Sequence, residues 1–289
     1  MTLPKLLLCT DLDRTLIPNG PEPESPTARP LFQRLCREPE VTLVYVSGRD
    51  KNLIHQAMDE FSIPEPRYAI TDVGTIIYEI IDRKWKICDE WTSLISSSWG
   101  DYSGTEIHNL LRSVSQIQQQ EARKQNRYKL SYYLPLKESH TDITKTIHDI
   151  LNSFDIDSNV IWSIDTNKNT GLIDILPARA NKLTAIRWLA TRLAMREDSI
   201  FFAGDSGNDI DVISSTIPSA IVANASSDFK SLALSAAQAR HSEDTLYIAK
   251  GLLPCMNGNY AAGILEGICY YWPKATEWLT SELRLLEKS

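Results

Sequence analysis

Short apolar runs alternate with helical patterns through the first part of the chain. Residues 6–10, 41–46 and 68–71 are apolar stretches of strand length. Between them, residues 31–37 and 51–61 carry their apolar side chains at the spacing of an amphipathic helix. Strands that alternate with helices in this way are joined by right-handed crossovers, so the pattern predicts a parallel sheet.

The same rhythm returns after Pro177, whereas the middle of the chain is different. After Pro177 the pattern predicts helices at residues 182–194, 209–215 and 263–271, and strands at residues 199–203 and 220–222. The chain from residue 80 to residue 171 is more polar. There we expect helices at residues 107–120 and 141–154, and strands at residues 129–134, 160–164 and 171–176. The predicted fold is therefore α/β, with a Rossmann-like parallel-sheet core (residues 1–79 and 172–289) and an inserted α+β domain (residues 80–171).

Composition narrows the classes of partner. The 289 residues carry a net charge of −7, which argues against nucleic acid because nucleic-acid binders present a basic face. A small phosphorylated substrate remains compatible, since a local site can be positive in an acidic protein. We expect a cytoplasmic protein without a membrane partner, because the sequence shows neither an apolar run of membrane-spanning length nor a signal-peptide pattern. Its five cysteines, widely spaced and without a Cys-x-x-Cys pair, predict reduced core thiols.

Acidic residues follow two of the predicted strands. Asp11 and Asp13 come directly after residues 6–10, and the stretch Gly204-Asp205-Ser206-Gly207-Asn208-Asp209 follows residues 199–203. Ligands of open α/β sheets bind at the carboxyl ends of the strands. A lone Asp-x-Asp is more often a turn or a helix N-cap. Two acidic strand ends together favour a divalent cation, because bunched carboxylates otherwise repel one another.

The segment Asp11-x-Asp13-x-Thr15 suits phosphoryl transfer through an aspartyl phosphate. The Asp11 carboxylate is placed to attack phosphorus in line. Asp13 is placed to protonate the leaving alcohol and then to deprotonate the attacking water.

Two further positions suit phosphate binding. Ser47 and Gly48 end the strand at residues 41–46, where a hydroxyl and nearby N–H groups can hold a phosphate oxygen; taken alone, Ser47 is more typical of a helix N-cap. Lys182 begins a predicted helix, where a cation opposes the helix dipole, so a nearby anion explains it better. A solvated surface lysine is the alternative.

In this order, the four segments resemble the motifs of the haloacid dehalogenase (HAD) superfamily of phosphatases. The resemblance covers residues 5–80 and 172–270. It implies Mg²⁺ as cofactor, Asp11 as nucleophile and Asp13 as general acid/base. It also implies phosphate binding by Ser47, Gly48 and Lys182, metal binding by Asp11, the backbone carbonyl of Asp13, Asp205 and, as an outer partner, Asp209, and support from Thr15 and Asn208.

The inserted domain lies where the C2-type cap of this superfamily is found, and within that group the chain is similar to sucrose-phosphate phosphatases. The likeness rests on residues 71–75, 129–133, 173–177 and 204–209. It implies substrate binding by Lys129, Asp174 and Asn181, a disaccharide phosphate such as sucrose 6-phosphate as substrate, and a glycosyltransferase of the same pathway as a candidate partner. Arg14 and Leu183 depart from the pattern, which commonly has Gly or Asn at the first position and Gly at the second.

Several alternatives share these motifs. Other glycosyl phosphates fit equally well: mannosylfructose phosphate, a glucosylglycerol-type phosphate or a glycosylated phosphoglycerate. A phosphotransferase or phosphomutase would use the same residues, because only the acceptor of the phosphoryl group differs. A non-catalytic sugar-phosphate sensor or glycosyltransferase subunit is disfavoured, since every chemical group of the motifs is present.

Overall fold

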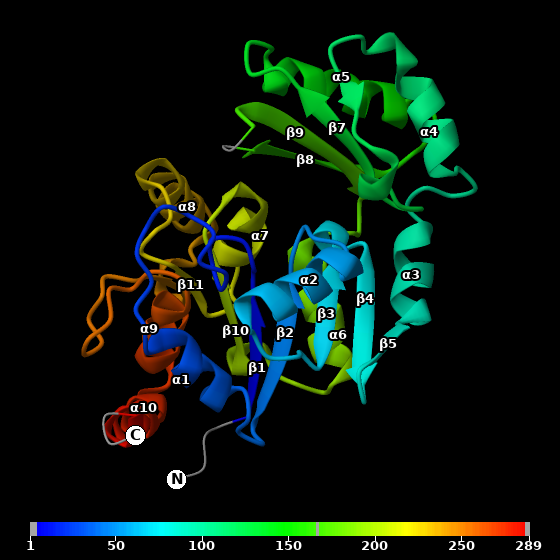
Figure 1. The fold of residues 1–289 in the computed structure, drawn as a ribbon. Helices are drawn as coiled ribbons and strands as arrows, with labels where there is room; N and C mark the ends of the chain where they lie inside the picture. The colour runs from blue at the N-terminus through cyan, green and yellow to red at the C-terminus, as the bar shows by residue number, and fades with distance from the viewer. Residues whose placement is uncertain (1–4, 166–167, 287–289) are drawn as a thin grey trace.

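The computed structural model describes residues 5–165 and 168–286, and these form two sheets of different kinds (Figure 1). The large sheet is mainly parallel, with strand order β12-β11-β10-β1-β2-β3-β4-β5. The small sheet is antiparallel, with strand order β6-β7-β9-β8. The predicted fold class, a parallel-sheet α/β core with an inserted α+β part, is confirmed.

Strand β1 lies in the interior of the large sheet, and all of its residues are buried. A strand covered on both faces needs apolar side chains in both directions, which is why its sequence is a continuous apolar run. A hairpin of two antiparallel strands extends one edge of the sheet. The strands of the large sheet are β1 (Leu6–Thr10), β2 (Val41–Val46), β3 (Tyr68–Thr71), β4 (Ile76–Ile81), β5 (Lys84–Ile87), β10 (Ile200–Gly204), β11 (Ser219–Ile221) and β12 (Leu246–Ile248).

Helices cover both faces of the large sheet. Leu6 and Leu8 of β1 pack in one core cluster with α1 (Ala28–Leu35), α2 (Lys51–Phe61), α9 (Ala261–Tyr271) and α10 (Pro273–Leu286). Leu7 and Cys9 pack in the other with α3 (Asp89–Ser96), α6 (Lys182–Arg192), α7 (Ile210–Ile213) and α8 (Ser227–Arg240). In the described ranges, no helix combines the length and apolar character that crossing a bilayer requires.

The small sheet is covered by helices on the side away from the core. Leu130, Tyr132 and Leu134 pack with Ile143 and Ile147 in one apolar cluster. Figure 1 shows the sheet lying between α5 and the part of the molecule built on the large sheet, and β8 contacts the turn at residues 207–209. The elements are β6 (Gln118–Gln119), β7 (Leu130–Leu134), β8 (Ser158–Asp165), β9 (Thr170–Pro177), α4 (Gly104–Leu110) and α5 (His140–Asn152).

Two sequence predictions differ from the structure in this region. The boundaries of the inserted part were expected at residues 80 and 171. In the structure β5 still pairs within the large sheet, and β9 belongs to the small sheet as far as Pro177. The helix predicted at residues 107–120 is wrong beyond Leu110. Its apolar spacing is real, since Ile107, Leu111 and Val114 are buried, but a short 3₁₀ turn and β6 follow α4 instead of further helix.

Candidate active site

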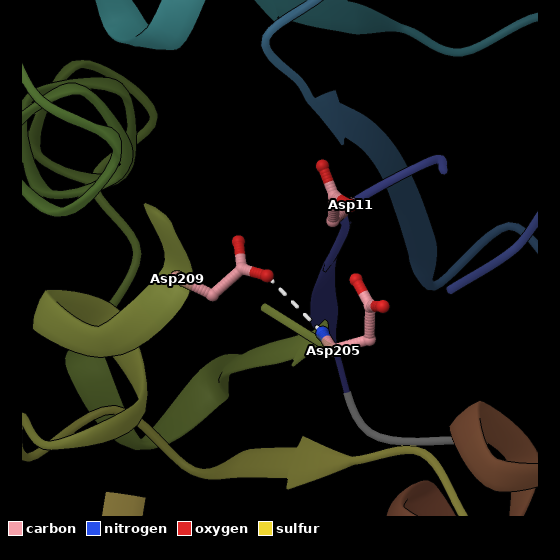
Figure 2. Close-up of side chains that lie close together, drawn as sticks. All are labelled: Asp11, Asp205 and Asp209. Atoms are coloured by element: carbon pink, nitrogen blue, oxygen red, sulfur yellow. Dashed lines mark hydrogen bonds between the residues drawn. The ribbon is translucent and has the colours of Figure 1, made fainter. Parts of the chain in front are cut away.

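The carboxyl ends of β1 and β10 bring two of the predicted acidic residues together. The strands are parallel neighbours with Thr10 opposite Ala203, and the N–H of Asp11 donates to the carbonyl of Ala203 at 2.9 Å. Carboxylate oxygens of Asp11, Asp205 and Asp209 all lie within 4.8 Å of one another, and the three residues are buried (Figure 2). The predicted meeting of the two acidic strand ends is therefore seen in the structure.

Asp209 organises the turn that carries Asp205. Its Oδ2 accepts hydrogen bonds from the backbone N–H groups of Asp205 at 3.1 Å and Ser206 at 3.2 Å, the first of which is drawn in Figure 2. A side chain at Gly204 would meet this carboxylate, because a Cβ there would lie 2.5 Å from Asp209 Oδ2. The glycine thus permits the close approach on which the turn depends.

Lys182 joins the two acidic segments. Its Nζ donates to Asp11 Oδ1 at 2.9 Å, to Asp209 Oδ1 at 2.6 Å and to Asn208 Oδ1 at 3.2 Å. Burial alone would lower the pKa of this ammonium, but the Asp11 and Asp209 carboxylates outweigh burial and raise that pKa. Lys182 is therefore a fully buried cation on the Asp11 carboxylate, and the alternative of a solvated surface lysine is excluded.

The remaining charge at the site is negative. Burial raises the pKa of Asp11 well above its usual value, and Asp209 and Asp205 add to this effect despite Lys182. Burial, followed by the Asp209 charge, raises the pKa of Asp205 to about 7. Lys182 and Arg14, whose Nε lies 3.4 Å from Asp205, are two cations beside three carboxylates, so an additional cation would stabilise the ionised forms.

The donor set fits a hard divalent cation such as Mg²⁺. It contains only oxygen atoms, the ligands that Mg²⁺ prefers. Both oxygens of Asp209 already accept hydrogen bonds, which suits the outer role expected for this residue. Asp205 is free of such strong contacts in the described part of the chain. Longer contacts reach its carboxylate from the Thr15 hydroxyl at 3.4 Å and from Arg14 Nε at 3.4 Å.

Asp13 is turned toward residues that the sequence did not single out. Arg49 makes a bidentate contact with its carboxylate: Nη2 donates to Oδ1 at 2.7 Å and Nε donates to Oδ2 at 2.8 Å. Asn19 Nδ2 also donates to Oδ1, at 2.7 Å. Burial would raise the pKa of Asp13, but Arg49 and then Asn19 lower it overall. Only the position of Arg49 directly after Ser47-Gly48 could have signalled this contact.

Ser47 lies at the carboxyl end of β2, one strand away from Asp11. Its N–H donates to the carbonyl of Ile70 at 2.9 Å, and its Oγ accepts from the N–H of Arg49 at 3.2 Å. The residue that caps α2 is Asp50, whose carboxylate accepts from the N–H groups of Asn52 and Leu53. Ser47 is thus not the N-cap that its sequence position alone suggested. The neighbouring Gly48 has room around it, because a Cβ at this position would lie 3.8 Å from its nearest neighbour, the Val73 side chain.

The three residues expected to bind substrate lie in different surroundings. Lys129 forms a buried ion pair with Asp72, Nζ to Oδ1 at 3.6 Å, which joins the chain before β7 to the turn after β3. Asp174 on β9 accepts a hydrogen bond from the Ser131 hydroxyl on the neighbouring strand β7. Asn181 caps α6, because its Oδ1 accepts from the N–H of Thr184 at 2.8 Å.

Comparison with known proteins places these features in a family. The sequence model described as sucrose-6F-phosphate phosphohydrolase matches residues 4–272. A HAD-like hydrolase from Nitrosococcus oceani, described as putative, is 42% identical over 275 residues, covering 95% of this chain and 74% of the relative. The mannosylfructose-phosphate phosphatase of Agrobacterium fabrum is 29% identical over 231 residues, covering 80% of this chain and 88% of the relative.

A solved structure agrees with the sequence comparisons. The sucrose-phosphatase from Synechocystis, crystallised in complex with sucrose and phosphate, superimposes with a TM-score of 0.74 at 25% identity, covering 93% of this chain and 98% of that one. The family match spans most of the chain, and it includes both acidic strand ends, the Ser47 strand end and Lys182. The chain therefore belongs to the sucrose-6F-phosphate phosphohydrolase family of HAD-type phosphatases, which are phosphoric monoester hydrolases.

Proposed function

We propose that the protein is a Mg²⁺-dependent sugar-phosphate phosphatase that acts through an aspartyl phosphate on a disaccharide phosphate such as sucrose 6-phosphate. The observation that carries the proposal is the Asp11 carboxylate, paired with buried Lys182 beside Asp205 and Asp209. Relatives support the substrate class, since one is a mannosylfructose-phosphate phosphatase and a solved structure holds sucrose and phosphate.

The protein groups divide the reaction between them. Asp11 Oδ1 is held by Lys182, which leaves the other carboxylate oxygen to attack phosphorus. Lys182 and the Ser47–Gly48 segment stabilise the oxygens of the transferring phosphoryl group. Asp13 gives a proton to the leaving alcohol and takes one from water when the aspartyl phosphate is hydrolysed.

Asp11 and Asp205 are the side chains that would hold Mg²⁺, together with the backbone carbonyl of Asp13, while Asp209 fixes the turn from outside. The ion supplies positive charge that lets an anionic nucleophile approach an anionic phosphate. Without a cation, burial and like charge favour the protonated forms of Asp11 and Asp205, and a protonated carboxyl is a poor nucleophile.

We propose that the small sheet acts as a cap that reads the sugar. Ser131 and Asp174 share one face of this sheet, since they are opposite each other on β7 and β9, and Leu130 and Tyr132 occupy the face covered by α5. The Lys129–Asp72 contact is longer than a hydrogen bond, so the ammonium keeps donors for a sugar hydroxyl. Asn181, which caps α6, contributes by positioning Lys182.

A panel of sugar phosphates tests the proposed function. Purified protein with Mg²⁺ should release inorganic phosphate from sucrose 6-phosphate faster than from glucose 6-phosphate or fructose 6-phosphate. Mannosylfructose phosphate, glucosylglycerol phosphate and a glycosylated phosphoglycerate belong in the same panel as the alternative substrates. Transfer of labelled phosphate to a second sugar, in place of release, would identify a phosphotransferase or phosphomutase. No release from any member would refute the proposal.

Removal of the metal is expected to stop turnover. The site offers only oxygen ligands and has an excess of carboxylate charge, so EDTA should abolish phosphate release and added Mg²⁺ should restore it. Ca²⁺ is the matched control, because it binds oxygen ligands but prefers a larger and less regular coordination shell. Full activity in metal-free buffer would show that Asp11 and Asp205 work without a cation.

Lys129→Ala is expected to damage the sugar reaction selectively. A lost charged hydrogen bond costs about 1.5–3 kcal/mol, which corresponds to about 10- to 150-fold in kcat/KM for the true sugar phosphate. Hydrolysis of p-nitrophenyl phosphate should change little, since it has no sugar to read. Lys124→Ala, which lies between β6 and β7 and is placed against the Tyr133 ring, is the control. Equal losses of Lys129→Ala on both substrates would mean that the residue supports folding or chemistry instead.

A further inference from the structure

The roles proposed above for nucleophilic attack, metal binding and phosphate binding do not use the contact between Arg49 and Asp13. We propose that Arg49 is a positioning residue that holds the Asp13 carboxylate at the open side of the site, in the orientation needed for proton transfer, with Asn19 assisting. This inference rests on the proposed function, in which Asp13 is the general acid and base.

The geometry fixes the rotation of a carboxylate that is otherwise free to turn. The Asp13 side chain is 43% exposed, whereas the Asp11 side chain is 6% exposed. A half-exposed carboxylate with no partner changes rotamer rapidly, and proton transfer then loses the advantage of a prearranged donor. A planar guanidinium that makes two parallel hydrogen bonds sets both the place and the plane of the carboxylate.

Arg49 is itself anchored to the strand ends around the site. Its N–H donates to Ser47 Oγ at 3.2 Å, and its carbonyl accepts from the N–H of Asp72 at 3.1 Å. The guanidinium also donates from Nη1 to the carbonyl of Leu53 at 3.1 Å. Arg49 therefore ties the loop after β1 to the loop after β2, which is more than an isolated surface ion pair does.

The hydrogen bonds leave one carboxylate oxygen suited to exchanging a proton. Oδ1 accepts from both Arg49 and Asn19, whereas Oδ2 accepts from Arg49 alone within the described part of the chain. An ionised carboxylate has about four acceptor positions, two on each oxygen. Oδ2 therefore keeps one position open while Arg49 holds it in place.

Both half-reactions can pass through Asp13 Oδ2. In the first, an Asp11 oxygen bonds to phosphorus, the ester P–O bond breaks, and the ester oxygen keeps the electron pair and takes the proton from Oδ2. In the second, water oxygen bonds to phosphorus, its proton passes to Oδ2, and the Asp11–phosphorus bond breaks with its electron pair returning to the carboxylate.

The test compares substrates whose leaving groups differ in their need for an acid. Nitrophenolate leaves without a proton. The kcat/KM for p-nitrophenyl phosphate reports only the steps up to phosphoenzyme formation, so it does not depend on Asp13 as an acid. For Arg49→Ala we expect kcat/KM for the sugar phosphate to fall at least about tenfold more than kcat/KM for p-nitrophenyl phosphate. The kcat for p-nitrophenyl phosphate should also fall, with a burst of nitrophenol, because hydrolysis of the phosphoenzyme still needs the base.

Equal losses of kcat/KM on both substrates would overturn the proposal, because they would make Arg49 a phosphate ligand. Unchanged kcat/KM values on both substrates would also overturn the proposal, because Arg49 would then have no role in proton transfer. The sugar phosphate used is whichever one the wild-type protein hydrolyses, so the absence of any sugar-phosphate turnover by wild type counts against the proposed function and not against Arg49.

A double variant separates positioning from direct phosphate binding. Asp13→Asn and Asp13→Asn/Arg49→Ala should form phosphoenzyme from p-nitrophenyl phosphate, in a single turnover, at rates within about threefold of each other. A loss of about tenfold or more in the double variant would contradict the proposal. Arg34→Ala is the matched control for stability, since Arg34 is a half-buried partner of Glu282 between α1 and α10. Arg49→Gln, which keeps the side chain as far as Cδ, replaces Arg49→Ala if the latter does not fold.

Discussion

Asp11→Asn is expected to abolish turnover of every phosphate ester. An amide oxygen is a poor nucleophile. Asp209, the other carboxylate that Lys182 contacts, cannot replace Asp11, because both of its oxygens already accept hydrogen bonds. Loss of a covalent nucleophile costs at least about 10⁴-fold in kcat. The measurement is phosphate release from the sugar phosphate and from p-nitrophenyl phosphate, with Mg²⁺ present throughout.

A nearby aspartate provides the matched control for Asp11. Asp211 is on α7 and pairs with Arg240 at the surface, so Asp211→Asn should stay close to wild type. Asp11→Ala is measured as well, because an asparagine can revert to aspartate by deamidation. Near wild-type release of phosphate by both Asp11 variants would rule out the covalent route.

Lys182→Met is expected to cost both stability and activity. Removing the buried ammonium leaves the Asp11 and Asp209 carboxylates without their partner, and breaking a buried ion pair in this way costs about 3–5 kcal/mol in the free energy of unfolding. The cost should shrink as the pH falls, because protonation of Asp11, whose pKa is raised by burial, removes part of the uncompensated charge. Urea unfolding in EDTA measures this cost.

An exposed lysine on α5 supplies the control for Lys182. Lys145 is exposed on α5, and Lys145→Met should change the free energy of unfolding by less than about 0.5 kcal/mol. An equally small effect of Lys182→Met would mean that the three carboxylates do not need this cation. Turnover should be lost even where Mg²⁺ restores part of the stability, because in the proposed mechanism Lys182 also stabilises the transferring phosphoryl group.

The parallel core was predictable because its strands are buried on both faces. Residues 6–10 and 41–46 are nearly uninterrupted apolar runs, and the observed β1 and β2 have those bounds. The hairpin β4–β5 was not predicted. Its turn uses Asp82 and Arg83, both with positive φ, 50° and 62°, and this pair lacks the Asn-Gly or Asp-Gly signature of such turns.

Within the site, sequence reasoning worked where neighbouring strands force residues together. Asp11 and Asp205 had to meet once β1 and β10 were parallel strands of one sheet. The bidentate Arg49–Asp13 contact and the Lys129–Asp72 pair could not be predicted in this way. They depend on loop conformation and side-chain rotamers, including the positive φ of 51° at Asp72, which the apolar pattern does not encode.

The most direct test of the proposed mechanism is to trap the covalent intermediate. Asp13→Asn, mixed with p-nitrophenyl phosphate, whose leaving group needs no acid, and Mg²⁺, is quenched in acid, digested and analysed by mass spectrometry. We predict one added phosphoryl group on the peptide that contains Asp11, and none when Asp11 is also replaced by asparagine. A phosphoryl group on another residue, or steady release of phosphate by Asp13→Asn with no phosphorylated Asp11 at any time, would contradict this mechanism.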